Sequence, residues 1–287
     1  MSTRARRRLP QLSGGQWVSV AFFEVILLAY AAIVVYPLIL TLVSSLKTTN
    51  AIYDHPLSLI PREPRWANYV DAWQQANFGT YFKNSIFVSV VSVVLILFLG
   101  SMASYVLARY PFRGNALVYL FFLLGFMIPV RLAIVPLFIL MRNLHLLDTL
   151  WSLICVYVAG GMPLAIFLMV TFFRRIPRDL EDAARIDGAN AFQIYSRIML
   201  PLVRPVLATV ALFEFLHVWN DFFFPLIFIR SDSHRTIPLG ISVFFGEYSN
   251  DWGLLFAALS ISLIPVIIVF LLMSKQFIAG LTVGAVK

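Results

Sequence analysis

Apolar residues along the chain fall into long runs that are separated by short polar connections. Six runs approach or exceed the roughly 20 residues that a helix needs to cross the hydrocarbon core of a bilayer, and they cover residues 17–45, 85–108, 116–140, 150–173, 206–229 and 254–274. Only helices or closed barrels satisfy backbone polar groups within lipid. The pattern therefore predicts an all-α membrane protein with six transmembrane helices.

Composition and charge support a membrane protein and suggest its orientation. Of the 287 residues, 60% are apolar and only 13% are charged. The net charge of +8 would suit a nucleic-acid partner, but the basic residues lie mainly in the segments that flank the apolar runs. With the N-terminus in the cytoplasm, about twice as many Lys and Arg residues fall inside as outside, as the positive-inside rule favours. We therefore expect a multi-pass protein of a bacterial or archaeal cell membrane, with both termini cytoplasmic and no nucleic-acid partner.

The predicted helices divide the chain into consecutive segments. They are a cytoplasmic tail (1–16), a first transmembrane helix (17–46), an external loop (47–84), a core (85–275) and a second cytoplasmic tail (276–287). The external loop is rich in Pro, Asn and aromatic residues, and it suits a short amphipathic helix on the membrane surface near Trp66, Tyr69 and Trp73. That helix would either anchor the first crossing or offer a surface to an external partner.

The longest cytoplasmic connection, residues 174–205, contains signals that start and stop helices. Pro177 can open a helix whose first turn is rich in carboxylates, which the helix macrodipole favours. Gly188 can adopt the left-handed conformation that ends a helix. Asn190 and Gln193 resemble a capping box that begins a second helix, and Pro201 would stop it. The pattern predicts a helix, a glycine turn and a second helix, which by themselves could be an interfacial hairpin that merely joins two crossings.

The same connection resembles a known family motif. The spacing of the EAA loop, which marks the membrane subunits of binding-protein-dependent ABC importers, is matched by Asp182, Ala183, Ala184, Gly188, Ile198, Leu200 and Pro201. The stretches MIPVRLAIVPLFIL, LEDAARIDGAN, HVWNDFFFPLIF and GLTVGAVK resemble permease subunits of carbohydrate importers of the maltose-transporter type, over roughly residues 68–287. Asp182 stands where that family usually has glutamate, so the carboxylate is kept with a shorter reach. The resemblance implies a type I importer permease bundle.

The resemblance also implies a mechanical role and a set of partners. A coupling helix would sit in a groove of a cytoplasmic ATPase subunit through Glu181, Asp182, Ala183, Ala184, Arg185, Asp187 and Gly188. The partners would be a homologous second permease, two ATPase subunits and an extracytoplasmic solute-binding protein. The chain has no GxxxxGK[ST] phosphate loop, so we expect ATP and Mg on the ATPase partners and no cofactor, metal site or catalytic residue here. The expected solute is a sugar, namely an oligosaccharide, a disaccharide or a related polyol or glycerophosphate.

Several polar residues lie within the predicted helices, where a charge costs about 2.5–3.5 kcal/mol on insertion scales. Glu214, His217 and Asp221 recur at intervals of three and four, which places them on one face of the fifth helix next to Asn220. Arg131 lies at a similar depth in the third helix. We expect Arg131 and Asp221 to pair or to line the outward half of a transport pathway. An ion pair with a purely structural role would produce the same pattern.

Other functions fit parts of the sequence. A secondary transporter driven through ionisable groups such as Glu214 and Asp221 would work without partners, but the two halves show no inverted repeat. An intramembrane enzyme finds poor support in the lone Cys155 and the scattered histidines. Within importers, a polyamine or a phosphate ester is the alternative to a sugar.

Overall fold

The computed structural model describes residues 14–75, 77–247 and 251–285, and helices and turns account for this part of the chain without any strand. Four of the described helices are long and apolar enough to cross a membrane, namely α1 (Gly14–Ser44), α4 (Phe78–Arg109), α7 (Leu150–Arg175) and α14 (Trp252–Ala285). Two bent pairs raise this number to six if each pair is one crossing. An all-helical protein that crosses the membrane several times is therefore confirmed.

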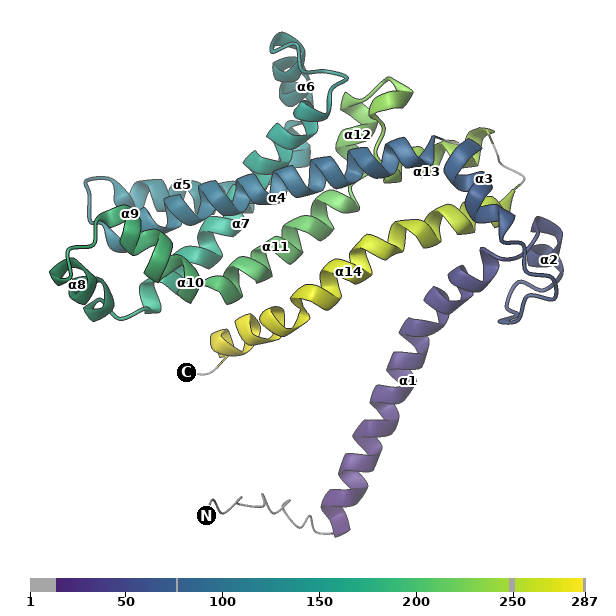
Figure 1. Ribbon diagram of the computed structural model, residues 1–287, viewed down its shortest axis with the longest axis horizontal. Coiled ribbons are helices and arrows are strands. Elements are labelled where there is room, and N and C mark those ends of the chain that lie inside the picture. The colour runs from purple at the N-terminus through teal and green to yellow at the C-terminus, as the bar shows by residue number, and fades with distance from the viewer. Residues whose placement is uncertain (1–13, 76, 248–250, 286–287) are drawn as a thin grey trace.

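The centre of the bundle is formed by α4 and α7, which pack along each other, while α11 (Arg204–Trp219) lies between α4 and α14 (Figure 1). The buried side of α4 carries a row of serines and a glycine, and a Cβ added at Gly100 would lie 3.2 Å from the Cβ of Ala165 in α7. In lipid, close packing of small residues is a main source of helix association. The small side chains of α4 therefore explain why these two helices pack so closely.

The first crossing, α1, makes few contacts with the rest of the chain. No residue in its most apolar stretch is buried. The C-terminal end of α1 contacts α14, and the rest of α1 extends away from the bundle (Figure 1). The residues that follow α1 are tightly held, because the buried Asn68 side chain donates hydrogen bonds to the carbonyls of Ser45 (2.8 Å) and Lys47 (2.9 Å). Over its described side chains, the first crossing is therefore held to the bundle near the C-terminal end of α1.

The segment after α1 contains two short helices, α2 (Thr49–Asp54) and α3 (Ala67–Gln75). The predicted short helix near Trp66 is thus present as α3, which packs against α14. The following crossing begins at Phe78, earlier than the predicted residue 85, so the loop is shorter than expected. Together with α13 (Ile237–Glu247), these helices lie at the end of the bundle opposite α8 (Asp179–Ile186) and the C-terminal end of α14 (Figure 1).

Two predicted helices are not continuous, and these predictions were wrong in that respect. The third run divides into α5 (Asn115–Met127), the 3-10 turn η1 (Val130–Ala133) and α6 (Ile134–Asn143), with a bend of 86°. Pro129, at the break, lacks a backbone N–H to continue the helix. The fifth run ends as α11 at Trp219 and resumes as α12 (Phe223–Phe228).

The two predicted tails are only partly within the described residues. Residues 1–13 and 286–287 lie outside the described part of the chain. The backbone of α14 continues to Ala285, through most of the segment 276–287 that was predicted to be a tail. The last crossing is therefore a longer helix than the apolar run 254–274 indicated.

Candidate functional site

The connection between α7 and α11 folds as a helical hairpin at one end of the bundle. Its first helix is α8, and Gly188 turns the chain with a φ of +84°. The capping box is present: the Asn190 side chain accepts a hydrogen bond from the Gln193 N–H, and the Gln193 side chain accepts one from the Asn190 N–H, both at 2.9 Å. The predicted helix, glycine turn and second helix are confirmed.

The second arm of the hairpin has the predicted length but is not a uniform α-helix. It runs through α9 (Ala191–Gln193), a π-helical turn η2 (Ile194–Met199) and α10 (Leu200–Leu202). Pro201 lies one residue before the end of this arm at Leu202, so the predicted stop is confirmed to within a residue. The chain then bends by 74° at Val203, where α11 follows.

The helix α8 has an inner and an outer face. Glu181 and Ala184, three residues apart, are only 4% and 7% exposed and face the bundle. The outer residues are exposed, including apolar Ile186 at 87%, and the predicted site residues among them are Asp182, Ala183, Arg185, Asp187 and Gly188. The structure thus divides the predicted coupling residues between two faces, so only some of them are available to a partner.

A second cluster surrounds Asp221, between α11 and α12. The carboxylate lies 3.3 Å from Nη2 of Arg131, accepts a hydrogen bond from the Tyr157 hydroxyl (2.9 Å) and accepts another from the Phe224 N–H (3.0 Å). Its side chain is 1% exposed, whereas that of Arg131 is 61% exposed and lies over the Phe223 ring. The predicted pairing of Arg131 with Asp221 is therefore present, while its role in a pathway stays a prediction.

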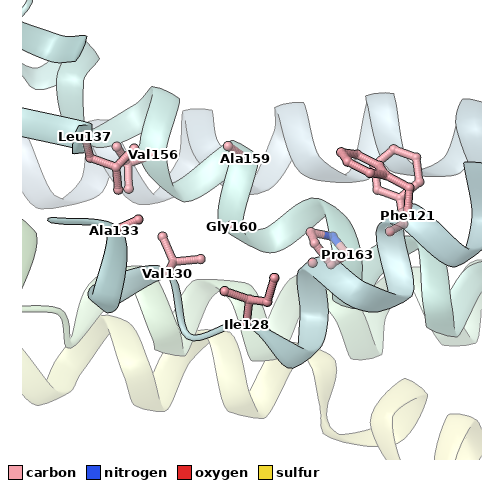
Figure 2. A pocket seen from close by; sticks show the side chains of 11 residues that line it. Phe121, Ile128, Val130, Ala133, Leu137, Val156, Ala159, Gly160 and Pro163 are labelled. Atoms are coloured by element: carbon pink, nitrogen blue, oxygen red, sulfur yellow. The ribbon is translucent and has the colours of Figure 1, made fainter. Parts of the chain in front are cut away.

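Two cavities flank the break between α5 and η1. The first, of about 320 Å³, is lined by apolar side chains and glycines of α5, η1, α6 and α7, including Phe121, Val130 and Pro163 (Figure 2). The second, of about 310 Å³, shares Gly160 with the first and adds the side chains of Arg131, Tyr157 and His217. Only the second cavity offers hydrogen-bonding side chains, which recognition of a hydroxyl-rich or charged solute requires.

Comparison with known proteins gives the family. Residues 96–282 match the family described as "Binding-protein-dependent transport system inner membrane component". The chain belongs to this family. This permease is 38% identical over 269 residues (93% of the chain, 89% of the relative) to the diacetylchitobiose uptake system permease protein NgcG of Streptomyces coelicolor. It is 34% identical over 284 residues (98% and 99%) to the arabinooligosaccharides transport system permease protein AraQ of Bacillus subtilis.

A solved structure agrees with this assignment. The permease resembles a chain of a bacterial ABC transporter involved in the import of the acidic polysaccharide alginate, with a TM-score of 0.80 and 26% identity over 94% of this chain and all of that one. The family, the relatives and the fold are those of ABC transporter permease subunits. The permease is therefore a transport component and not an enzyme.

Of the other polar residues predicted along the fifth run, Glu214 and His217 lie toward α7, and Asn220 contacts its own helix. Glu214 is buried and faces α7, since a Cβ added at Gly161 would lie 2.7 Å from Oε2 of Glu214. His217 is exposed, with its ring edge-on to Tyr157, and Asn220 donates to the carbonyl of Leu216 in its own helix. Glu214, His217 and Asp221 therefore all lie on the α7 side, in agreement with the predicted single face, although α11 ends before Asp221.

Sequence reasoning missed the partners that complete these sites. Tyr157 of α7 binds Asp221, and Arg109 of α4 lies against Glu181, and both partners are distant in sequence. A tyrosine in an apolar run has no pattern that marks it as a hydrogen-bond donor. Among the described residues, no group of three or more His, Cys, Asp or Glu side chains is placed to hold a metal ion.

At the end of the bundle opposite α8, Asp148 joins two connections. Its Oδ1 accepts hydrogen bonds from the Arg230 N–H (2.9 Å), the Ser231 N–H (2.8 Å) and the Ser231 hydroxyl (2.9 Å). Burial by itself raises the pKa of Asp148, but these hydrogen bonds and the nearby His234 lower it by more, so the pKa lies below its ordinary value. The ionised carboxylate therefore holds the loop before α7 to the loop after α12.

Proposed function

We propose that this permease is the membrane-spanning subunit of an ATP-driven sugar importer and forms half of the translocation pathway with a homologous second permease. The family description supports a binding-protein-dependent system. The names of relatives with diacetylchitobiose, arabinooligosaccharides and alginate support a carbohydrate, most simply an oligosaccharide. A solute-binding protein outside and two ATPases inside complete the assembly, and ATP and Mg bind to the ATPases.

The outer face of α8 is the observation that carries the proposed coupling to ATPases. Leu180 and Ile186 are 44% and 87% exposed on an ordered hairpin beside charged Asp182 and Arg185. Exposed apolar side chains ringed by polar ones are typical of an interaction surface. Since the hairpin lies beyond the ends of the crossings, it is placed to meet a soluble partner. The outer residues would therefore contact the ATPase, while Glu181 and Ala184 hold the helix from within.

The orientation follows from the same assignment. With α5 to α6 counted as one broken crossing and α11 to α12 as another, the permease has six crossings, with both termini and the α8 hairpin in the cytoplasm of a bacterial or archaeal cell. The Asp148 junction and the helices α2, α3 and α13 then lie outside, where a solute-binding protein docks. Arg131 lies at a break in its crossing, and broken helices are tolerated at membrane depth where they line a cavity or meet protein. The second cavity, with Arg131 and Tyr157, would accordingly face the pathway.

Affinity purification of the tagged permease from native membranes tests this proposal. The expected result is recovery of a second permease and ATPase subunits. Ile186→Glu should reduce the recovered ATPase at least tenfold, because a buried charge would replace an apolar contact, whereas the control Ile186→Val should leave the recovery unchanged. An intact assembly without ATPase, or full recovery with Ile186→Glu, would contradict the coupling role.

A transport assay tests the solute. Proteoliposomes that contain the recovered assembly and its binding protein should accumulate labelled diacetylchitobiose or arabinotriose when ATP is supplied. Accumulation of a polyamine or a phosphate ester in place of both sugars would support a non-sugar importer. Accumulation by the permease alone, with a proton gradient and no ATP, would support a secondary transporter.

A further inference from the structure

A buried ion pair joins the coupling hairpin to the end of a crossing. Nε of Arg109, the last residue of α4, lies 2.6 Å from Oε1 of Glu181 in α8, and the two side chains are 4% and 5% exposed. Oε2 of Glu181 also lies 3.9 Å from Arg185, whose side chain is 52% exposed. The charge of Glu181 is thus neutralised chiefly by Arg109, out of contact with water.

The guanidinium of Arg109 reaches a third element as well. Its Nη2 donates a hydrogen bond of 2.6 Å to the carbonyl of Ile176, the residue that caps α7. This carbonyl belongs to a helix end, where backbone acceptors lack partners within the helix. Arg109 therefore binds the end of α7 and the start of α8 at once, which fixes the short link between them.

An aromatic layer extends the same contact to the second arm of the hairpin. The ring of Tyr105 lies 5.7 Å from that of Phe173 in α7 and 5.4 Å from that of Tyr195 in η2. The Tyr105 hydroxyl donates to Oε2 of Glu181 at 3.4 Å, and the Tyr195 hydroxyl is hydrogen bonded to Ser101 of α4 at 2.7 Å. Both arms of the hairpin are therefore held by one helix, α4.

We propose that Arg109 and Glu181 are positioning residues that make the hairpin and the ends of α4 and α7 one rigid body, so that a displacement of α8 moves both crossings. This inference rests on the proposed coupling of α8 to an ATPase. A hairpin joined only through its two chain connections would bend when pushed, and the movement would be lost before it reached the crossings. Loss of either charge leaves the other buried without its close ionic partner, which is strongly unfavourable, so the hairpin separates from α4.

The test is the number of solute molecules imported per ATP hydrolysed by the reconstituted assembly, with arabinotriose or diacetylchitobiose as the solute. Glu181→Gln and Arg109→Gln should lower this ratio at least tenfold while ATP hydrolysis continues. Arg109→Lys keeps the charge and should retain more of the ratio than Arg109→Gln. The matched control is Asp179→Asn, which removes an exposed carboxylate in the first turn of α8 outside the named coupling residues, and it should change the ratio less than twofold. A wild-type ratio in the Glu181→Gln assembly would overturn the inference.

A second measurement decides the matter if a variant does not assemble. A spin label on exposed Ala183, in a Cys155→Ser background, reports the motion of α8 in the purified permease. The spectrum should show a more mobile label in Glu181→Gln than in the Asp179→Asn control, and equal mobility would overturn the inference. If the wild-type permease binds no ATPase, the proposed function fails; if the wild-type assembly transports and the variants match it, only the rigid junction fails.

Discussion

Replacing Asp221 by alanine should destabilise the permease far more than replacing its ionic partner Arg131. The Asp221 carboxylate is the acceptor for the Tyr157 hydroxyl and for the Phe224 N–H, and both donors belong to residues that are almost fully buried. A buried donor without an acceptor costs about 1–3 kcal/mol, so two of them cost about 2–6 kcal/mol. Arg131 contributes less to this sum, because its side chain is 61% exposed and both hydrogen bonds to the Asp221 carboxylate remain when it is removed.

The assay is equilibrium unfolding of the purified permease in mixed micelles, followed by tryptophan fluorescence. Asp221→Ala should lower the free energy of unfolding by about 2–6 kcal/mol, and Arg131→Ala should lower it by less. Asp187→Ala removes an exposed carboxylate and serves as the control, with an expected change within about 0.5 kcal/mol. A loss below about 1 kcal/mol in Asp221→Ala, or equal losses in the Asp221 and Arg131 variants, would refute this account of the buried cluster.

Three further predictions follow from the backbone and the loops. In thermal unfolding, Gly161→Ala should be less stable than the matched variant Gly160→Ala by about 1–3 kcal/mol. The Cβ added at Gly161 would lie 2.6 Å from Ile96, whereas the Cβ added at Gly160 would lie no closer than 3.7 Å to another side chain. Equal stabilities would contradict the packing of α4 on α7. Gly188→Ala should cost about 1–2 kcal/mol, since the φ of +84° strains an L side chain in open space, and an unchanged melting temperature would show that the turn has moved. The pKa of Asp148 is lowered on folding, so the stability that Asp148 gives the fold is complete above the unfolded pKa and is lost as the pH falls through the folded pKa. The difference in unfolding free energy between wild type and Asp148→Asn should therefore shrink below about pH 4. A difference that grows on acidification would contradict the lowered pKa.

Local signals in the sequence predicted the local structure well. Gly188 and the capping box of Asn190 and Gln193 were identified because each acts over a few residues, and both are present. Long apolar runs predicted the helices that became α1, α4, α7 and α14 for the same reason. The pairing of Arg131 with Asp221 was also predictable, since two opposite charges at similar depth in lipid have few other partners.

Features set by distant contacts could not be predicted. Hydropathy measures the apolar content of a run but not its direction, so the break after Trp219 was missed. That break depends on Asp221, which accepts a hydrogen bond from the Phe224 N–H and starts α12 as an N-cap would. The inward orientation of Glu181 depends on Arg109, a residue of α4 that is distant in the sequence. Nothing in the acidic pattern of α8 distinguishes that carboxylate from the exposed Asp182.

The length of α4 determines where its final charge lies relative to the lipid. At about 1.5 Å per residue, its 32 residues extend about 48 Å, whereas the hydrocarbon layer is about 30 Å thick. A helix of this excess length either tilts or projects into the headgroup layer. In both cases its terminal Arg109 lies at or beyond the edge of the acyl chains. The guanidinium therefore avoids the free-energy cost of a charge in the hydrocarbon core.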